Sequence, residues 1–244
     1  MSNELAQLAD SLGKMRQELD GKAYIEQYIQ TLTHELKSPL TGIRSAAELL
    51  HEPMSDDHRA QFLKNIEHEA SRIHAVIEQL LNLAKIEQIQ ALDNVESVNI
   101  KDLVDDILQG QSARMELRSV TCENFLPEHF SLEGDRFLLQ QAFSNLLDNA
   151  IAFTPKSGHI SITELDGGVQ IRNSGTQIPE FALPRLTDRF FSLARPETQE
   201  KSTGLGLNFV KEIALVHQLT LQVGNDAEGV TVKLLPQAHT TSKY

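Results

Sequence analysis

Cysteine is nearly absent from this sequence: Cys122 is the only one in 244 residues. A single cysteine cannot form a disulfide within the chain, and it excludes a zinc site built from several cysteines. Such usage suits a reducing compartment. Free cysteines behave as small apolar residues and are among the most buried residue types. We therefore expect Cys122 to pack in a core strand and not to act as a reactive thiol.

Long apolar runs are absent as well. No segment approaches the roughly 18–20 consecutive apolar residues that a membrane-spanning helix needs. The first residues, Met1 to Glu4, lack the basic and apolar regions of a signal peptide. We therefore expect a soluble chain. Because its start resembles the middle of a helix, we also expect it to be cut from a longer protein.

Positive charge is scarce. The chain has 22 Lys and Arg against 34 Asp and Glu, which gives a formal net charge of −12. So acidic a chain would repel a phosphate backbone, which argues against nucleic-acid binding. A basic partner surface, or a cationic metal at an anionic ligand, fits this charge better.

Apolar residues at heptad spacing begin the chain, with intervals of three, four, three and four. This seam predicts a coiled coil, and its members are Leu5, Leu8, Leu12, Met15 and Leu19. The apolar series resumes at Ile25 out of phase with the first, so we expect a stutter near Gly21. The slip is either a weak joint between two helices or a point where rotation or tilt enters from upstream.

Two long amphipathic helices are predicted on either side of the segment Glu52–Ser55. Ser55 is a suitable N-cap for the second helix, because Asp56 and Asp57 follow in its first turn. A short turn between two long helices gives an antiparallel hairpin. Two helices cannot bury both apolar stripes alone, so we expect a dimer that forms a four-helix bundle.

From about residue 95 short β-like segments alternate with helical ones, which indicates a separate α+β domain. The boundary is predicted near 88–96, which is polar. The predicted strands are Ser97–Ile100, Ser119–Asn124, His159–Leu165, Val169–Asn173, Thr220–Gly224 and Val230–Leu235. The predicted helices cover 101–115, 135–153 and 206–217.

The first motif with chemical potential is the run from Thr33 to Leu40. His34 lies off the apolar stripe of Leu36 and Leu40 and should face solvent. An unprotonated imidazole is a nucleophile, and the adjacent Glu35 can act as its base or hold its ring orientation. Pro39 removes a backbone donor, so we expect the helix to bend just past His34. Taken alone, the motif favours the simpler interpretation, a surface His beside a surface Glu on a helix.

The second motif is Asn145 to Asn149. Residues at i and i+4 share one helix face, and carboxamide oxygens suit Mg²⁺ together with phosphate oxygens. Two further motifs contain glycine, Asn173–Pro179 and Ser202–Leu207. In the latter, glycines precede a helix, so that backbone amides can approach an anion at a helix N-terminus. The long polar stretch between them, about 180–203 and including Arg195–Glu200, is typical of a lid.

In this order and at these separations, the motifs resemble the boxes of the sensor histidine kinases of two-component systems. The matching segments are the H box (34–40), the N box (141–155), the F box (188–191) and the second glycine box (203–207). The resemblance covers nearly the whole chain. The segment from Gly21 into Thr33–Pro39 is similar to the CreC-type sensors of this family, in which a membrane and periplasmic region would precede residue 1.

The resemblance implies an α-helical hairpin that forms a dimeric four-helix bundle, followed by an α+β two-layer sandwich of the GHKL (histidine kinase ATPase) type. Residues 1–21 would be a signalling helix at the end of a HAMP-like coiled coil. Residues 22–92 would form the dimerisation and histidine phosphotransfer domain, and 93–238 the ATP-binding catalytic domain. Hinge motion is expected near 88–96.

The resemblance also implies roles for particular residues. His34 would accept the γ-phosphoryl group of ATP with Glu35 as base, and Ser38 is the third implied catalytic residue. Asn149 would coordinate Mg²⁺. The phosphoryl group would then pass to an aspartate of a cytoplasmic response regulator, and the chain would be the cytoplasmic part of an inner-membrane protein. The implied nucleotide-binding residues are Asn145, Asn149, Asn173, Gly175, Thr203, Gly204, Leu205 and Gly206.

The sequence departs from the family pattern in three places. Asn173 replaces the usual Asp that accepts a hydrogen bond from the adenine amino group, and an uncharged acceptor weakens that bond by about 1 kcal/mol. Gln177 replaces the second glycine of the same box, which narrows the backbone choices there. Ser38 stands where members with phosphatase activity usually have Thr or Asn, although its hydroxyl could still orient a water.

These departures keep an alternative open: a member with weak ATP binding that acts mainly as a response-regulator phosphatase or scaffold. A second alternative is a structural coiled-coil protein with an unrelated α+β domain, which would not explain four boxes in order. A gyrase-like or chaperone ATPase shares the nucleotide fold, but the preceding hairpin with His34 argues against it.

Overall fold

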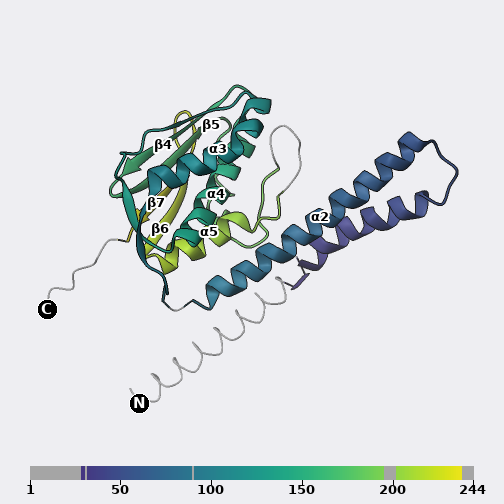
Figure 1. The fold of residues 1–244 in the computed structure, drawn as a ribbon, viewed down its shortest axis with the longest axis horizontal. Coiled ribbons are helices and arrows are strands. Elements are labelled where there is room, and N and C mark those ends of the chain that lie inside the picture. The colour runs from purple at the N-terminus through teal and green to yellow at the C-terminus, as the bar shows by residue number, and fades with distance from the viewer. Residues whose placement is uncertain (1–28, 31, 90, 195–201, 238–244) are drawn as a thin grey trace, which may run out of the picture. The chain divides into compact units, whose positions relative to one another are not determined.

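The computed structural model describes residues 29–30, 32–89, 91–194 and 202–237. The chain divides into two compact units, 1–77 and 78–244, each of which is treated by itself (Figure 1). The heptad segment over 3–19, the slip near Gly21 and the lid residues 195–201 lie outside the described residues.

The first unit contains a helical hairpin. Residues 32–49 form one helix, which continues through Pro39, and α2 (Asp56–Glu87) begins the return. The predicted cap at Ser55 is confirmed, because its Oγ accepts a hydrogen bond of 3.4 Å from the amide of His58. The two helices are antiparallel, since Glu35 lies beside Arg72 whereas Gly42 lies beside Glu69, three residues earlier on α2.

Only a narrow stripe of this hairpin is buried within one chain. Ala46 and Val76 are 6% and 2% exposed, and Leu36 is half-buried. Leu40, expected on the buried stripe, is instead 60% exposed. Other large apolar side chains of the hairpin share this exposure, namely Leu49, Leu63 and Ile77. The hairpin therefore leaves an apolar surface that its own two helices do not cover.

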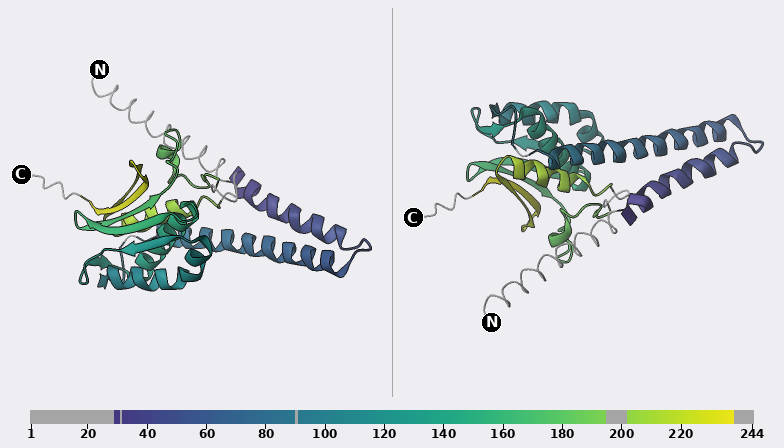
Figure 2. Two further views of the ribbon diagram at one scale, coloured as in Figure 1. Left: turned by 90° about the horizontal axis from the view of Figure 1, so that it is seen from above. Right: turned by 90° about the horizontal axis from the view of Figure 1, so that it is seen from below.

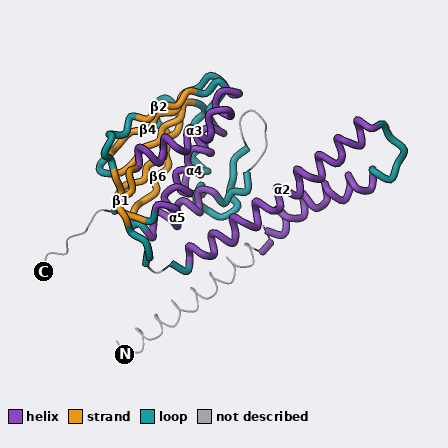
Figure 3. The backbone as a smooth tube through the Cα atoms, viewed as in Figure 1, coloured by secondary structure: helices purple, strands orange, loops and turns teal. Residues whose placement is uncertain are grey.

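The second unit is built on a five-stranded sheet, drawn in orange in Figure 3, whose strand order is β2-β4-β5-β7-β6. β2 and β4 are parallel and all other neighbours are antiparallel. The strands are β2 (Thr121–Asn124), β4 (His159–Leu165), β5 (Gly168–Ser174), β6 (Leu219–Asn225) and β7 (Gly229–Pro236). A separate antiparallel pair consists of β1 (Glu96–Asn99) and β3 (Ser131–Gly134).

The sheet has one apolar face, which the alternation of strand residues produces. In register across β4, β5 and β7 lie Ile162, Ile171 and Val232, while their neighbours Ser161 and Arg172 point to the other face. Helices α3 (Ile100–Arg118), α4 (Arg136–Phe153) and α5 (Gly206–Val216) cover the apolar face (Figure 2). The predicted two-layer α+β sandwich is therefore confirmed.

Specific contacts fix the helices that border the site. Asp135 caps α4 by accepting a hydrogen bond of 3.0 Å from the amide of Leu138. His217, at the C-terminus of α5, links this helix to α4. Its Nε2 accepts a hydrogen bond of 3.0 Å from the amide of Asp135. The other ring nitrogen, Nδ1, therefore carries the proton and donates to the carbonyl of Ile213 at 2.8 Å. One buried imidazole thus joins the C-terminus of α5 to the N-terminus of α4.

The last turns of α2, from Glu78 onward, belong to this second unit. Leu83 and Ile86 are 2% and 3% exposed and lie in the same hydrophobic core as Val98 and Leu139. The core of the second unit is therefore completed by a helix that begins in the first.

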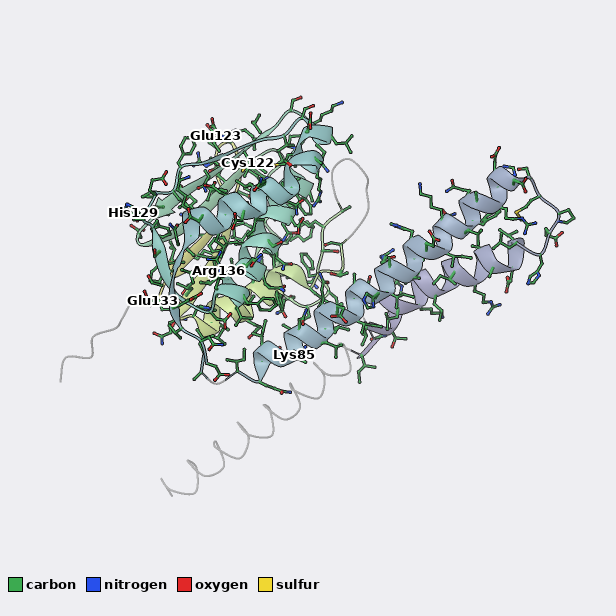
Figure 4. The ribbon with its side chains drawn as sticks, viewed as in Figure 1. Lys85, Cys122, Glu123, His129, Glu133 and Arg136 are labelled. Carbon is green, nitrogen blue, oxygen red and sulfur yellow. The ribbon has the colours of Figure 1, made fainter. Side chains whose placement is uncertain are left out.

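Cys122 lies on β2, the edge strand, where it is partly buried against the core (Figure 4). Burial raises the pKa of its thiol to about 12, and the negative charges of Glu123 and Asp105 act in the same direction. So high a pKa disfavours the reactive thiolate, as expected for a packed cysteine, although the strand that holds Cys122 is at the edge of the sheet and not in its core. Among the residues that the structure describes, no helix combines the length and the apolar character that crossing a membrane requires.

Candidate functional site

A cavity of about 480 Å³ opens in the second unit. This volume is in the range of small-molecule sites. Its walls come from α4, from β5, β6 and β7, and from the loops that flank the short 3₁₀ helix Leu183–Arg185. Apolar lining residues include Leu146, Ala150, Ile171, Ile178, Leu186, Val223, Val230 and Val232.

Several predicted nucleotide-binding residues line this cavity, although they are far apart in the sequence. They are Asn149 on α4, Asn173 on β5, and Gly204 and Gly206 before and at the start of α5. Asn173 is 6% exposed. The cavity is thus mainly apolar, with a few polar groups that converge on it, which is the usual composition of a ligand pocket.

One end of the cavity meets the N-terminus of α5. Its N-cap, Leu205, has no side chain that could accept a hydrogen bond from the first amides of the helix. A Cβ added at Gly206 would lie 3.0 Å from Oδ1 of Asn145 and 3.8 Å from Nδ2 of Asn149. The glycine therefore lets α5 begin against both carboxamides. Uncapped amides at a helix N-terminus are suited to anions such as phosphate.

Gly204 shapes the rim at this end. Its φ of +68° is in the left-handed region, and an added Cβ would lie 2.4 Å from the carbonyl carbon of Phe190. Its carbonyl accepts a hydrogen bond of 2.9 Å from the amide of Phe190. Phe190 belongs to the segment that resembles the F box, so the two segments meet through backbone contact.

The loop after β5 forms the opposite rim. Gly175, at φ +134°, turns the chain but does not line the cavity. Nε2 of Gln177 donates a hydrogen bond of 2.6 Å to the carbonyl of Asp226. Asn225 and the backbone of Ile178 exchange two more, of 2.8 and 2.7 Å. These contacts attach the loop to the β6–β7 turn, and sequence reasoning missed Asn225 and Asp226 because no local motif marks them.

The β6–β7 turn is held by the carboxylate of Asp226. It accepts hydrogen bonds from the amides of Glu228 and Gly229 and lies 2.7 Å from Nε of Arg172. The amide of Glu228, then that of Gly229 and the charge of Arg172 hold the pKa of Asp226 below its ordinary value, against a smaller opposing effect of burial. The turn therefore depends on an ionised carboxylate.

The remaining predicted residues do not line the cavity. The hydroxyl of Thr203 donates a hydrogen bond of 2.7 Å to Oε1 of Gln79 on α2. The side chain of Leu205 is 1% exposed and lies in the core. Asn145 lies beside the N-terminus of α5, with its Nδ2 donating to the carbonyl of Gln141 at 2.9 Å. That bond leaves Oδ1 of Asn145 directed to Gly206.

The predicted catalytic residues lie in the hairpin unit. His34 and Ser38 are exposed, and Glu35 is half-buried. Nη2 of Arg72 lies 3.8 Å from Oε2 of Glu35, and Nη1 lies 4.0 Å from Oε2 of Glu69. Arg72 thus holds the carboxylate next to His34 from the opposite helix.

Metal ligands of the usual charged kinds are not clustered: within the described residues there is no group of three or more His, Cys, Asp or Glu that could hold an ion. The carboxamides of Asn145 and Asn149 are neutral oxygen donors beside an anion-binding helix terminus. Such donors fit a hard cation that arrives with a phosphate ligand.

Two family models match the chain. The His Kinase A (phospho-acceptor) domain matches residues 24–89, and the model described as histidine kinase-, DNA gyrase B-, and HSP90-like ATPase matches 134–240. The chain belongs to the sensor histidine kinase family. Its H-box histidine, His34, lies within the first match, and the cavity residues from Asn149 to Val232 lie within the second.

Two curated sensor proteins are similar over most of the chain. Sensor protein CreC of Escherichia coli (strain K12) is 40% identical over 232 residues, which cover 93% of this chain and 48% of CreC. Heme sensor protein HssS of Staphylococcus haemolyticus is 28% identical, over 97% of this chain and 53% of HssS. The chain thus spans about half the length of these relatives.

Solved histidine kinases share the fold. The kinase ThkA in complex with the response regulator protein TrrA matches with a TM-score of 0.70 at 21% identity, over 91% of this chain and 65% of that one. The Acinetobacter baumannii kinase AdeS matches with a TM-score of 0.63 at 22% identity, over 83% and 97%.

Proposed function

We propose that this chain is the catalytic portion of a sensor histidine kinase that phosphorylates its own His34 from Mg-ATP and passes the phosphoryl group to an aspartate of a response regulator. The observation that carries the proposal is the cavity in which Asn149, Asn173 and Gly204 meet the uncapped N-terminus of α5. Its apolar walls suit a nucleobase, and its amide-lined end suits phosphates.

The first transfer forms a bond between an imidazole nitrogen of His34 and the γ-phosphorus while the bond from that phosphorus to the β–γ bridging oxygen breaks, leaving ADP. His34 is exposed, so a phosphate donor can approach it. Glu35 accepts the imidazole proton, and Arg72 keeps its carboxylate in place. In the second transfer the phosphorus–nitrogen bond breaks and a carboxylate oxygen of the response regulator takes the phosphoryl group.

Positioning and charge neutralisation supply most of the catalysis of phosphoryl transfer. We assign Asn149 as the protein ligand of Mg²⁺, with Asn145 beside the phosphates. The bound ion would neutralise phosphate charge in a chain that is itself acidic. Leu205 and Gly206 would contribute backbone amides, and Thr203 a hydroxyl. Ser38, exposed one turn after His34, would orient a water for dephosphorylation.

We further propose that the chain works as a homodimer through the exposed apolar side chains of the hairpin, with domains at 22–92 and 93–238. The cytoplasmic location is proposed as well, with membrane segments upstream, and it rests on the similarity to the sensor proteins CreC and HssS. The response-regulator partner is supported by ThkA, whose structure was solved in complex with such a protein.

Labelling with [γ-³²P]ATP and Mg²⁺ tests the proposal. We expect wild type to gain acid-labile label and His34→Gln to gain none. The matched control is His68→Gln, because His68 is also an exposed helical histidine followed by a glutamate, Glu69. His68→Gln should label like wild type. If wild type gains no label under conditions in which a related histidine kinase autophosphorylates, the autokinase activity is contradicted. That result would favour a phosphatase or a scaffold.

A further inference from the structure

Asn173 is a buried polar residue on the central strand of the sheet. Its Cα pairs with Ile160 of β4 on one side and Val230 of β7 on the other. The alternation along β5 places Asn173 on the buried face, in line with Ile171 and Val169. It is 6% exposed and lines the cavity. A polar group so placed must find its hydrogen-bond partner inside the cavity or in the adjacent backbone.

The cavity offers a ligand no formal charge: none of the described residues that line it is Asp, Glu, Lys, Arg or His. Asp226, whose carbonyl holds Gln177 at the rim, does not line the cavity, and its carboxylate is engaged by two amides and Arg172. Within the part of the chain that the structure describes, no carboxylate therefore takes the place of the acid that the family pattern has at position 173. The described groups that can form hydrogen bonds with a purine in this cavity are therefore neutral.

The Asn173 carboxamide can present either a donor or an acceptor. Its Nδ2 makes one long hydrogen bond, 3.4 Å to the carbonyl of Ser174, near the outer limit of such bonds. The terminal torsion of Asn is broad and nearly two-fold, so the amide can turn over for the loss of this weak contact. With Oδ1 inward it accepts from a 6-amino group, and with Nδ2 inward it donates to a 6-oxo group.

Gln177, in the loop that follows β5, supplies a second neutral group that lines the cavity. Its Nε2 is committed to the carbonyl of Asp226 at 2.6 Å, so its Oε1 is the atom left to accept a hydrogen bond. A 6-oxopurine differs from adenine in carrying a ring N–H that needs such an acceptor. The two departures from the family pattern therefore complement each other.

We propose that Asn173 makes the cavity discriminate only weakly between purine bases. The cavity then binds 6-oxopurine nucleotides in the same affinity range as adenine nucleotides. This inference rests on the proposed function, because it assumes that the cavity takes a purine nucleotide. A carboxylate at this position would accept a hydrogen bond from a 6-amino group. Opposite a 6-oxo group, which is also an acceptor, neither group would have a donor. Sites that leave a buried polar group unpaired discriminate strongly.

Calorimetric titration of the 244-residue chain with ADP and with inosine diphosphate, both with Mg²⁺, tests the inference, because the two bases differ only in the 6-amino/6-oxo exchange and its ring proton. We expect the two Kd values of wild type to differ by less than about 20-fold. Asn173→Asp should tighten the binding of ADP and weaken that of inosine diphosphate, so that the ratio of the two Kd values exceeds about 100-fold. Asn94→Asp, an exposed change of equal charge between α2 and β1, should leave the ratio unchanged.

A wild-type preference for ADP of about 20-fold or more, or a ratio that Asn173→Asp does not widen, would overturn the inference and leave the proposed function standing. Wild type that binds neither nucleotide while showing a cooperative thermal transition would overturn both. Far-UV circular dichroism establishes that Asn173→Asp is folded. If it is not, Asn173→Ser, which keeps a donor and an acceptor, must retain a ratio within about threefold of wild type for the inference to stand.

Discussion

The hydroxyl of Thr203 donates a hydrogen bond of 2.7 Å to Oε1 of Gln79, across 124 positions of sequence. The next residue, Gly204, lines the cavity, while Gln79 lies near the end of α2. A second bond from the same helix joins Glu87 to Arg189, which precedes Phe190 at the rim. The end of α2 thus holds both segments that meet at Gly204.

This relationship predicts that Gln79→Ala tightens nucleotide binding. The Thr203 hydroxyl is occupied by Gln79 and must leave it before it can bind a phosphate. Removing a hydrogen bond worth about 1 kcal/mol should improve the affinity for Mg-ADP by about fivefold. Calorimetry measures the change. Gln88→Ala, which changes an exposed glutamine directly after the end of α2, should have no effect. An unchanged or weakened affinity in Gln79→Ala would contradict the prediction.

Gly204→Ala should destabilise the second unit and weaken nucleotide binding. Alanine at a positive φ costs about 1–2 kcal/mol, and here its Cβ would also meet backbone atoms of Phe190 that cannot move independently. We expect a lower Tm and at least a tenfold loss in Mg-ADP affinity, of the order that 1.4 kcal/mol produces. Differential scanning calorimetry and nucleotide titration measure the two effects.

Gly110→Ala is the matched control. Gly110 is exposed in the interior of α3, and an added Cβ would meet nothing within 4 Å. It should raise the unfolding free energy by about 0.5–1 kcal/mol without changing nucleotide affinity. Equal effects of the two substitutions would refute the assigned role of Gly204.

The stabilisation contributed by Asp226 should depend on pH. Because its pKa is lowered in the folded state, its contribution is fully present above the unfolded value of about 3.9 and is lost as pH falls through the folded value. Asp226→Ala should therefore unfold more easily than wild type by a constant amount between pH 7 and pH 5, and the difference should shrink below about pH 4. Urea unfolding at several pH values measures it, with Asp93→Ala, an exposed carboxylate between α2 and β1, as control.

Leu40→Glu should dissociate the proposed dimer. Leu40 is 60% exposed in one chain, and burying a carboxylate at that position of a bundle would weaken association more than about 100-fold. Sedimentation equilibrium measures the mass. Leu117→Glu, on α3 in the second unit and 84% exposed, should remain dimeric. Dissociation by Leu117→Glu and not by Leu40→Glu would place the contact in the second unit.

Local sequence was enough to predict elements with strong periodicity. β4 begins and ends at His159 and Leu165 as predicted, and α4 begins one residue after the predicted start because Asp135 is its cap. β3 was missed. It has four residues with one buried apolar side chain, Leu132, and its pairing partner β1 lies more than 30 positions earlier. A strand so short is specified by its partner and not by its own residues.

Only part of the candidate site could be predicted from the sequence, namely the residues that stand in local motifs. Asn149, Asn173 and Gly204 stand in motifs with regular spacing, so their convergence on one cavity could be anticipated from the resemblance. The contacts of Gln177 with Asp226 and of Thr203 with Gln79 join residues 49 and 124 positions apart and carry no local signal. Only the tertiary structure brings these pairs together.

The continuity of α2 across both units limits where this protein can be divided. A fragment that begins at residue 93, the boundary predicted from the sequence, would lack Leu83 and Ile86 and would open an apolar hole beside Val98. A fragment that begins at residue 78 would keep that surface covered. We expect the longer fragment to be monodisperse and the shorter one to aggregate during purification, and a stable, soluble fragment 93–238 would contradict this. Chimaeras that graft this ATPase onto another sensor should accordingly be joined within α2, upstream of Gln79.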